Sequence, residues 1–316
     1  MLTALAGGVG AAKLLAGLVQ VVDPADITAI VNTGDDVVLH GLHISPDLDT
    51  VTYTLAGLDN KETGWGLAGE TWTVMDALER LGGETWFRLG DQDLATHLYR
   101  TGRLGAGASL SQVTAELAAA QGVTVRLLPM SDDPVRTRLT LPAGAGDPLD
   151  PEEHEVAFQH YFVRLRHDVA VSSIAFDGAA SASPAPGVLD AIGAAELVIA
   201  CPSNPLVSIG PLLAVPGVAE ALVARRPDVV AVSPIIAGAA LKGPADRMLS
   251  ELGHEASVVG VARLYAPWVG TLVIDGADAS LAGAVEAEGL RCVVAPTIMD
   301  SPMAAAAAAK AVLDAR

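Results

Sequence analysis

Residues 2–31 read LTALAGGVGAAKLLAGLVQVVDPADITAIV, and this stretch decides the fold. The apolar run Leu2–Ala6 leads into a cluster of glycines, and an apolar periodic segment then continues to about Val22. Pro24 breaks the pattern before a second apolar run, Ile27–Val31. Strand, glycine turn, helix and strand in this order form a βαβ unit, which implies two parallel strands joined by a right-handed crossover.

The same alternation returns in the C-terminal part of the chain, where short apolar runs and helical segments follow one another up to an alanine-rich end. Alternating strands and helices are typical of an open sheet with helices on both faces. We therefore predict an α/β fold with a doubly wound, mostly parallel, Rossmann-like sheet. Residues 1–130 and 186–316 would form this nucleotide-binding core.

The segment between them, residues 131–185, has a different character. Val135–Leu141 reads VRTRLTL, an alternation typical of an antiparallel strand with one solvated face. A turn rich in Gly, Pro and Asp is expected over residues 143–151, followed by a charged helix over Glu152–Arg166 and a strand over Val169–Phe176. We predict a smaller inserted α+β subdomain here.

The composition excludes some classes of function. Of the 316 residues, 51% are hydrophobic, enough for a large buried core, and the formal net charge is −18. A nucleic-acid binder would normally carry a basic face, and strong acidity works against binding to DNA or to anionic membranes. No apolar run reaches the length of about 18 residues that a membrane span needs.

The N-terminus and the cysteines bear on the compartment. The first residues are apolar but lack a basic leader, so they fit a first strand better than a signal peptide. Cys201 and Cys292 lie far apart without metal-binding spacing, which fits a reducing cytosol and excludes a disulfide framework. We expect a cytoplasmic protein.

An acidic segment, residues 32–50, follows the second strand and reads NTGDDVVLHGLHISPDLDT. The segment carries four carboxylates and two histidines: Asp35, Asp36, Asp47, Asp49, His40 and His43. Connections in compact domains are usually about 4–6 residues long. A longer acidic connection is either a solvated loop or a place that holds a metal ion or a cationic group. Ser45 and Pro46 mark the start of a helix within it.

Several explanations stay open for the four acids. An acid near the end of the second strand of a dinucleotide-binding fold can bond a ribose, which Asp35 or Asp36 could do. Asp47 and Asp49 could simply favour the positive end of a helix dipole. Oxygen ligands beside a phosphate would also suit Mg²⁺. The histidines are better explained as structural or substrate-contacting residues, because Mg²⁺ rarely binds imidazole.

The glycine turn, Gly7, Gly8 and Gly10 with Lys13 on the following helix, lies where backbone amides and a helix N-terminus can bind a phosphate. Its spacing matches neither the G-x-G-x-x-G dinucleotide motif nor the G-x-x-x-x-G-K-[ST] P-loop. A tight turn between strand and helix, without a ligand, explains the glycines equally well.

Three later segments offer further candidates. Ser203 and Asn204, between two prolines at a strand end, could bond a base or a phosphate, or could only cap a helix. Arg88, beside aromatic residues, could stack on a planar ring or bind an anion, or could form a surface ion pair. Lys242 could reach a phosphate, although a solvated lysine is the usual case. Because ligands of open α/β sheets bind at the carboxyl ends of strands, the agreement among these turns favours a nucleotide-linked substrate.

Taken together, these segments resemble the family of 2-phospho-L-lactate transferases, whose actinobacterial branch is called phosphoenolpyruvate transferase. The resemblance is carried by LAGGVGAAKLL, NTGDD, HISPDLDTVTY, WFRLGDQDLATHLYRTGRL, CPSNPLVSIGPLL and SPIIAGAALKGPA, which keep the family's order and span most of the chain. It implies a transferase of coenzyme F-420 biosynthesis.

The reaction that the resemblance implies has two substrates. The donor is a guanylylated three-carbon acid, enolpyruvyl-diphospho-5′-guanosine or lactyl-diphospho-5′-guanosine. The acceptor is the ribityl hydroxyl of the deazaflavin Fo (7,8-didemethyl-8-hydroxy-5-deazariboflavin). The phosphoenolpyruvyl or 2-phospho-L-lactyl group is transferred and GMP is released. The alanine- and glycine-rich composition favours the actinobacterial, enolpyruvyl donor.

The resemblance also implies roles for individual residues. The cofactor would be Mg²⁺, held by Asp35, Asp36 and Asp49. The catalytic groups would be Asp36 and Asp49. Fo would contact Asp49, Arg88 and His43. The nucleotide part of the donor would be bound by Gly7, Gly8, Gly10, Lys13, Asn32, Thr33, Ser203, Asn204, Ser208 and Lys242. A homodimer is expected.

Two other functions stay open. A related branch of the same superfamily comprises non-enzymatic nucleotide-sugar-binding regulators of metabolism, which share the glycine turn and the NTGDD region. The segments DLDT and WFRLGDQD favour the transferase. An NAD-dependent oxidoreductase is disfavoured by the glycine spacing. The expected partners are therefore small molecules, and neither nucleic acid nor a membrane.

Overall fold

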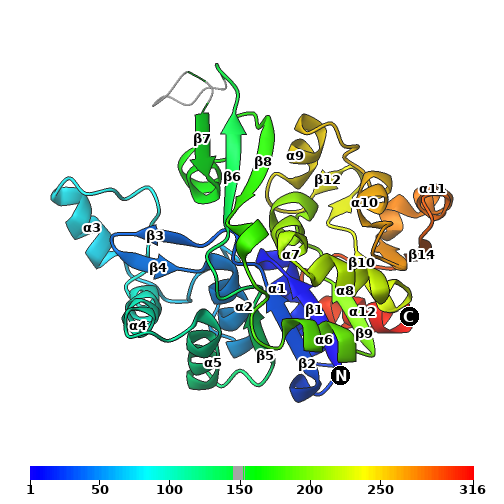
Figure 1. Cartoon of the computed structure of the whole chain (residues 1–316), viewed down its shortest axis with the longest axis horizontal. Coiled ribbons are helices and arrows are strands. Elements are labelled where there is room, and N and C mark those ends of the chain that lie inside the picture. The colour runs from blue at the N-terminus through cyan, green and yellow to red at the C-terminus, as the bar shows by residue number, and fades with distance from the viewer. Residues whose placement is uncertain (145–151, 153) are drawn as a thin grey trace.

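The computed structural model describes residues 1–144, 152 and 154–316. Its centre is a seven-stranded sheet with the spatial order β14-β13-β10-β9-β1-β2-β5, and every neighbouring pair is parallel (Figure 1). The strands are β1 (Leu2–Ala6), β2 (Ile27–Val31), β5 (Arg126–Pro129), β9 (Leu197–Ala200), β10 (Val229–Val232), β13 (Thr271–Ile274) and β14 (Arg291–Val294).

Numbered along the chain, the strand order is 3-2-1-4-5-6-7. This is the doubly wound arrangement, in which the winding direction reverses between the first strand, β1, and the fourth, β9. The predicted α/β fold with a doubly wound, Rossmann-like parallel sheet is confirmed. The crevice at the carboxyl ends of β1 and β9 is where such folds bind ligands.

Helices cover both faces of the sheet (Figure 1). One layer consists of α1 (Gly8–Leu18), α2 (Pro46–Ala56), α5 (Leu110–Ala120) and α12 (Pro302–Asp314). The other consists of α6 (Val188–Ala194), α7 (Gly210–Ala214), α8 (Val218–Ala224), α9 (Ala245–Glu251), α10 (Val258–Tyr265) and α11 (Ala282–Ala287). Successive residues of a strand point to opposite faces of the sheet. Ala4 and Ala6 pack against the layer that contains α1, and Leu5 packs against the layer that contains α7.

Helices α1 and α12 pack with their backbones close together. A Cβ placed on Gly17 would lie 2.2 Å from the carbonyl oxygen of Ala305. Only glycine permits this approach, and the alanines of α12 supply the matching small surface. The last helix of the chain thereby braces the helix that follows the glycine turn.

Residues 37–44 and 57–105 form an arm beside the sheet (Figure 1). The arm contains the hairpin strands β3 (Val37–Leu39) and β4 (Leu42–Ile44) and the helices α3 (Thr73–Arg80) and α4 (Asp93–Gly105). The hairpin was not predicted. His40 and Gly41 connect its strands with φ angles of 53° and 76°, as in the two-residue turns that favour positive φ. His40 is therefore a turn residue of the hairpin.

A three-stranded antiparallel sheet, β7-β6-β8, forms from the segment predicted as an inserted subdomain. Its strands are β6 (Arg136–Leu141), β7 (His154–Ala157) and β8 (Ser173–Asp177). Strand β6 confirms the strand predicted over Val135–Leu141, whereas β8 begins later than the predicted Val169. The boundaries of the subdomain stay a prediction.

The helix predicted over Glu152–Arg166 is wrong for His154–Ala157, which form a strand, whereas residues 158–164 are helical. The chain forms β7 and then a single turn of π-helix, His160–Arg164. Val156 and Phe158 are two residues apart and both pack into the small sheet's core, so the period of two outweighed the helix-forming charged residues. The turn predicted over residues 143–151 lies almost entirely outside the described residues.

Short elements complete the chain. They are β11 (Ile235–Ile236), β12 (Ala239–Ala240) and the 3₁₀ turns Pro24–Asp26, Ala179–Ser181, Arg226–Asp228 and Gly276–Leu281, with a π turn over Pro205–Ile209. Within the described ranges, no single helix is long and apolar enough to cross a membrane. One bent pair of helices, Pro205–Ala214 with Val218–Ala224, has sufficient length and apolar composition when the two are taken together.

Candidate functional site

The crevice at the switch point of the sheet brings three predicted segments together. Gly7, after β1, donates its backbone N–H to Ser203 Oγ at 3.2 Å, and Ser203 Oγ donates to the carbonyl oxygen of Gly7 at 2.8 Å. Asn32, after β2, donates its backbone N–H to Ala6 at 2.8 Å. The ends of β1, β2 and β9 therefore meet as the sequence predicted.

Close packing accounts for two of the glycines in the turn. A Cβ on Gly7 would lie 2.6 Å from Ser208 Cβ, and a Cβ on Gly10 would lie 2.1 Å from the carbonyl oxygen of Pro202. Gly8 begins α1 with a φ of +70°, a left-handed conformation that favours glycine. These constraints fix the turn against the segment after β9.

Replacing Gly10 by alanine is expected to lower the free energy of unfolding by about 1–3 kcal/mol, because the new methyl group meets a backbone carbonyl that cannot move freely. Urea denaturation measures the change. Gly102→Ala is the matched control: a Cβ there meets nothing within 4 Å, and alanine is the better helix former. Equal destabilisation by both changes would refute the packing role of Gly10.

One side-chain amide joins two carboxylates at the crevice. Asn32 Nδ2 donates to Asp35 Oδ2 at 3.2 Å and to Asp47 Oδ2 at 2.9 Å, and Asn32 Oδ1 accepts the backbone N–H of Gly34 at 2.8 Å. Asp47 also lies against the glycine turn, since a Cβ on Gly8 would lie 3.4 Å from Asp47 Oδ1. A carboxylate thus lies at the N-terminus of α1, where the sequence suggested a phosphate.

These acids are crowded. Burial holds the pKa of Asp35 well above its ordinary value, and the neighbouring charge of Asp47 adds to the shift. Burial also raises the pKa of Asp36 to about 7 and that of Asp47 to about 6. Asp36 Oδ2 accepts from Ser45 Oγ at 2.7 Å. Among the described residues, Oδ1 of Asp35 and Oδ1 of Asp36 are buried without a hydrogen-bond donor.

Buried carboxylates with free oxygens call for a positive partner. The donors at this crevice are hard oxygens, the ligand type that Mg²⁺ and Ca²⁺ prefer. Thr33 Oγ1, also buried and without a partner in the described part of the chain, adds another oxygen. The residues present therefore fit a divalent cation.

Asp49 is held differently, by a buried arginine. Arg100 on α4 donates from Nη1 to Asp49 Oδ2 at 3.1 Å and makes a second, short contact from Nη2 to Asp49 Oδ1. The exposed fractions of the two side chains are 2% for Arg100 and 9% for Asp49. Arg100 Nη1 also reaches the carbonyl oxygen of His43 at 3.3 Å. Both oxygens of Asp49 are thus engaged by one guanidinium.

Arg100 was not predicted, although a signal was present. Asp93, His97 and Arg100 have the spacing i, i+4, i+7 and share one face of α4. His97 Nε2 lies 3.1 Å from Asp93 Oδ2, and Tyr53 on α2 donates to Asp93 Oδ1 at 2.5 Å. This face joins the arm to the helix that carries Asp47 and Asp49.

The same network contains a second group with metal-ligand chemistry. Asp49, Asp93 and His97 present ligand atoms within 4.8 Å of one another. However, Arg100 already engages both oxygens of Asp49, and imidazole suits transition metals better than Mg²⁺. The oxygen-only group at Asp35 and Asp47 is the better fit for Mg²⁺.

The remaining predicted residues have other partners in the structure. Arg88 pairs with Asp76 at 2.6 Å and lies 5.2 Å from the ring centre of Trp72, and no ion pair joins it to Asp49. Asn204 Oδ1 accepts from the backbone of Leu206 at 2.9 Å, so it caps the turn that follows.

Two lysines complete the set. Lys242 Nζ donates to the carbonyl oxygen of Thr63 at 3.0 Å, and a Cβ on Gly64 would lie 3.5 Å from Val9 in the glycine turn. Two loops from distant parts of the chain therefore meet beside this turn. Lys13 makes no ion pair with any residue in the described ranges.

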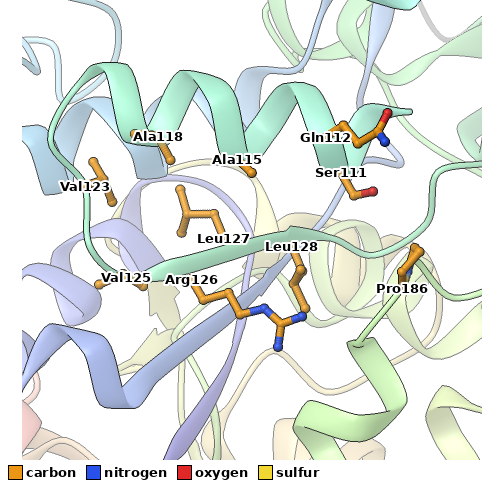
Figure 2. Close-up of a pocket in the computed structure, with 11 residues that line it drawn as sticks. Ser111, Gln112, Ala115, Ala118, Val123, Val125, Arg126, Leu127, Leu128 and Pro186 are labelled. Atoms are coloured by element: carbon orange, nitrogen blue, oxygen red, sulfur yellow. The ribbon is translucent and has the colours of Figure 1, made fainter. Parts of the chain in front are cut away.

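A separate groove lies between α5 and the edge strand β5, with a cavity volume of about 370 Å³ (Figure 2). Figure 2 shows mainly apolar side chains around it, with Gln112 at one end and Arg126 on the strand. None of the acids or glycines described above lines it. The groove is therefore distinct from the crevice at the switch point.

Comparisons with known proteins agree with this geometry. The family model described as "2-phospho-L-lactate transferase CofD" matches residues 2–298. The phosphoenolpyruvate transferase of Streptomyces griseus is 48% identical over 98% of this chain and 96% of its own length. That of Mycolicibacterium smegmatis is 41% identical over 99% of this chain and 98% of its own length.

Among solved structures, a UPF0052 family protein from Bacillus halodurans aligns with a TM-score of 0.59 and 16% identity, covering 99% of this chain and 98% of that chain. At this identity the likeness concerns the fold alone. The match over nearly the whole chain and the identity to the curated relatives confirm the resemblance that the sequence motifs indicated: the chain belongs to the 2-phospho-L-lactate transferase family.

Proposed function

We propose that this protein transfers the phosphoenolpyruvyl group of enolpyruvyl-diphospho-5′-guanosine to the ribityl hydroxyl of Fo and releases GMP. Its family makes it a transferase of coenzyme F-420 biosynthesis. The observation that carries the proposal is the pair of carboxylates on Asn32, placed at the switch point beside the contact between Gly7 and Ser203. The curated relatives named phosphoenolpyruvate transferase support the choice of donor.

The reaction moves one phosphorus atom between two oxygens. The ribityl hydroxyl oxygen attacks the phosphorus that bears the three-carbon unit, and the bond from that phosphorus to the bridging oxygen breaks. GMP leaves with the electron pair, and the hydroxyl proton passes to a base. Such transfers depend on positioning and on neutralisation of charge.

The chain offers residues for both needs. Asp35 and Asp47 would hold Mg²⁺, which would neutralise charge on the diphosphate. Asp36 would accept the hydroxyl proton; this role is supported by Ser45, which donates to one of its oxygens, while the other is buried without a donor in the described part of the chain. Asp49, engaged by Arg100, would orient the acceptor rather than take the proton.

A turnover assay tests the proposal. The protein is incubated with Fo, Mg²⁺ and either guanylylated donor, and GMP and a more anionic deazaflavin are measured by ion-exchange chromatography. Turnover with the enolpyruvyl donor is the expected result. Absence of turnover with both donors, together with tight binding of a UDP-sugar, would favour the nucleotide-sugar-binding regulator instead.

The role of Asp36 has its own prediction. Asp36→Asn is expected to lower kcat by about 100- to 10,000-fold, since it removes the proton acceptor, and to leave the KM for the donor nearly unchanged. Asp190→Asn, at an exposed position of α6, removes one charge elsewhere and should behave as wild type. A kcat for Asp36→Asn within threefold of wild type would exclude this role.

A further inference from the structure

Strand β6 of the small antiparallel sheet docks onto the acidic segment. The backbone N–H of Thr137 donates to the carbonyl oxygen of Gly34 at 2.7 Å, and a Cβ on Gly34 would lie 2.8 Å from Thr137 Oγ1. Gln159, beyond β7, donates from Nε2 to the carbonyl oxygen of Asp35 at 3.1 Å. These contacts fix the residue before Thr137, Arg136, beside the acids.

The nearby arginines differ in how far they are engaged. Arg100 is paired with Asp49, and Arg138, two residues along the same strand, pairs with Asp177 at 3.0 Å. Arg136 is partly buried, yet among the described residues it donates only to the carbonyl oxygen of Val135, at 2.8 Å, and forms no ion pair with a carboxylate. Most of its five N–H donors therefore lack an acceptor within residues 1–144, 152 and 154–316.

Arg136 also acts electrostatically on His43 in the hairpin. Burial lowers the pKa of His43, and Arg136 lowers it further. In the part of the chain that the structure describes, Arg136 forms no salt bridge with a carboxylate at the crevice, which leaves its guanidinium able to bind an anion from solution.

The proposed donor carries a diphosphate into a crevice that is already acidic. A divalent cation neutralises part of this charge, and a guanidinium presents a planar pair of donors that matches phosphate oxygens. We propose that Arg136 binds a phosphate group of the donor, so that the small antiparallel sheet supplies one side of the diphosphate-binding site. This assignment deepens the proposed function and rests on it for the identity of the donor.

The test uses inorganic pyrophosphate with Mg²⁺ as a binding probe, followed by calorimetry, and the transfer assay as a second measurement. Arg136→Gln is expected to weaken pyrophosphate binding and raise the KM for the donor by about 10- to 100-fold each, the loss of a charge-assisted hydrogen bond. The KM for Fo should stay unchanged. Arg138→Gln, on the same strand and engaged by Asp177, should bind pyrophosphate as wild type does.

The outcomes separate the two proposals. Unchanged pyrophosphate affinity and unchanged donor KM in Arg136→Gln would overturn the assignment of Arg136 while leaving the transferase function in place. Weakened pyrophosphate binding in a protein that turns over neither donor would support Arg136 and overturn the proposed function. If Arg136→Gln does not fold, Arg136→Lys serves as the test variant, because lysine keeps the positive charge but lacks the planar pair of N–H donors. We then expect pyrophosphate affinity to fall threefold or more. Unchanged pyrophosphate affinity in Arg136→Lys would overturn the assignment.

Discussion

Replacing Arg100 by methionine is expected to lower the free energy of unfolding by about 3–5 kcal/mol, because the change leaves the carboxylate of Asp49 buried without its counter-charge. Methionine keeps much of the side-chain volume, so the loss reports the charge rather than a cavity. Urea denaturation followed by circular dichroism measures it. Transfer activity should fall as well, since the arginine also holds the hairpin through the carbonyl oxygen of His43.

Two further variants separate charge from packing. Asp49→Asn should also destabilise, because it leaves the guanidinium of Arg100 buried and unpaired, whereas the double variant Asp49→Asn with Arg100→Met should recover part of the loss. Arg103→Met is the control. Arg103 lies on the same helix and pairs with Glu116 at the surface, so its replacement should lower the free energy of unfolding far less than Arg100→Met does. Additive losses in the double variant would show that the two side chains do not act as a pair.

Replacing Asp47 by asparagine is expected to stabilise the metal-free protein while abolishing its response to Mg²⁺. The change removes one of two carboxylates that share the amide of Asn32. We expect a gain of about 1–2 kcal/mol near neutral pH, because the raised pKa of Asp47 means that the folded state disfavours its charge. Transfer should fall roughly a thousandfold, since each lost 1.4 kcal/mol of metal-assisted charge stabilisation is a tenfold loss in rate.

Thermal unfolding with and without Mg²⁺ measures both parts of this prediction. At a concentration of 100 times its dissociation constant, a ligand adds about 2.7 kcal/mol to stability, and this gain should be present in wild type and absent in Asp47→Asn. Asp26→Asn, which removes an exposed charge just before β2, should keep the full gain in stability with Mg²⁺. An equal Mg²⁺ response in wild type and Asp47→Asn would exclude Asp47 as a ligand.

The raised pKa of Asp47 also predicts how the stability of the protein depends on pH. A carboxyl group whose pKa is higher in the folded state than in the unfolded state ionises more readily when the chain unfolds. The metal-free protein should therefore lose stability as pH rises from about 4 through the folded pKa of Asp47, about 6. The loss should be smaller in Asp47→Asn.

Local patterns were sufficient for the sheet and for the meeting of its strand ends. The run Leu2–Ala6, the glycines and the run Ile27–Val31 encode a βαβ unit through periodicity and turn chemistry alone. From that unit, the carboxyl edge of the sheet follows, and with it the approach of Gly7 to Ser203. These features could be predicted because each depends on neighbouring residues and on the regular geometry of parallel strands.

Contacts between distant segments could not be predicted in the same way. Asp49 and Arg100 are 51 residues apart, and nothing near Asp49 indicates that a helix of the arm would bring it an arginine. Asp47 looked like a residue at a helix start, yet it accepts from Asn32 and lies against the turn before α1. The metal set expected from the resemblance, Asp35, Asp36 and Asp49, stays a prediction, and Arg100 engages both oxygens of Asp49.

Assembly and location stay predictions. A homodimer and a cytoplasmic location were expected from the resemblance and from the cysteines. Both cysteines are free, Cys201 in the core and Cys292 partly buried, which agrees with the expected lack of a disulfide framework. Sedimentation of the purified protein would decide the oligomeric state.

The place of β1 in the sheet also governs when the site can exist during synthesis. β1 leaves the ribosome long before one of its two neighbours, β9, which begins only at Leu197. Until then one edge of β1 has no native partner, and an unpaired strand edge is a template for wrong pairing. The crevice at the switch point closes only after β9 has been made, so the nascent chain depends on protection of this edge more than its mature fold suggests.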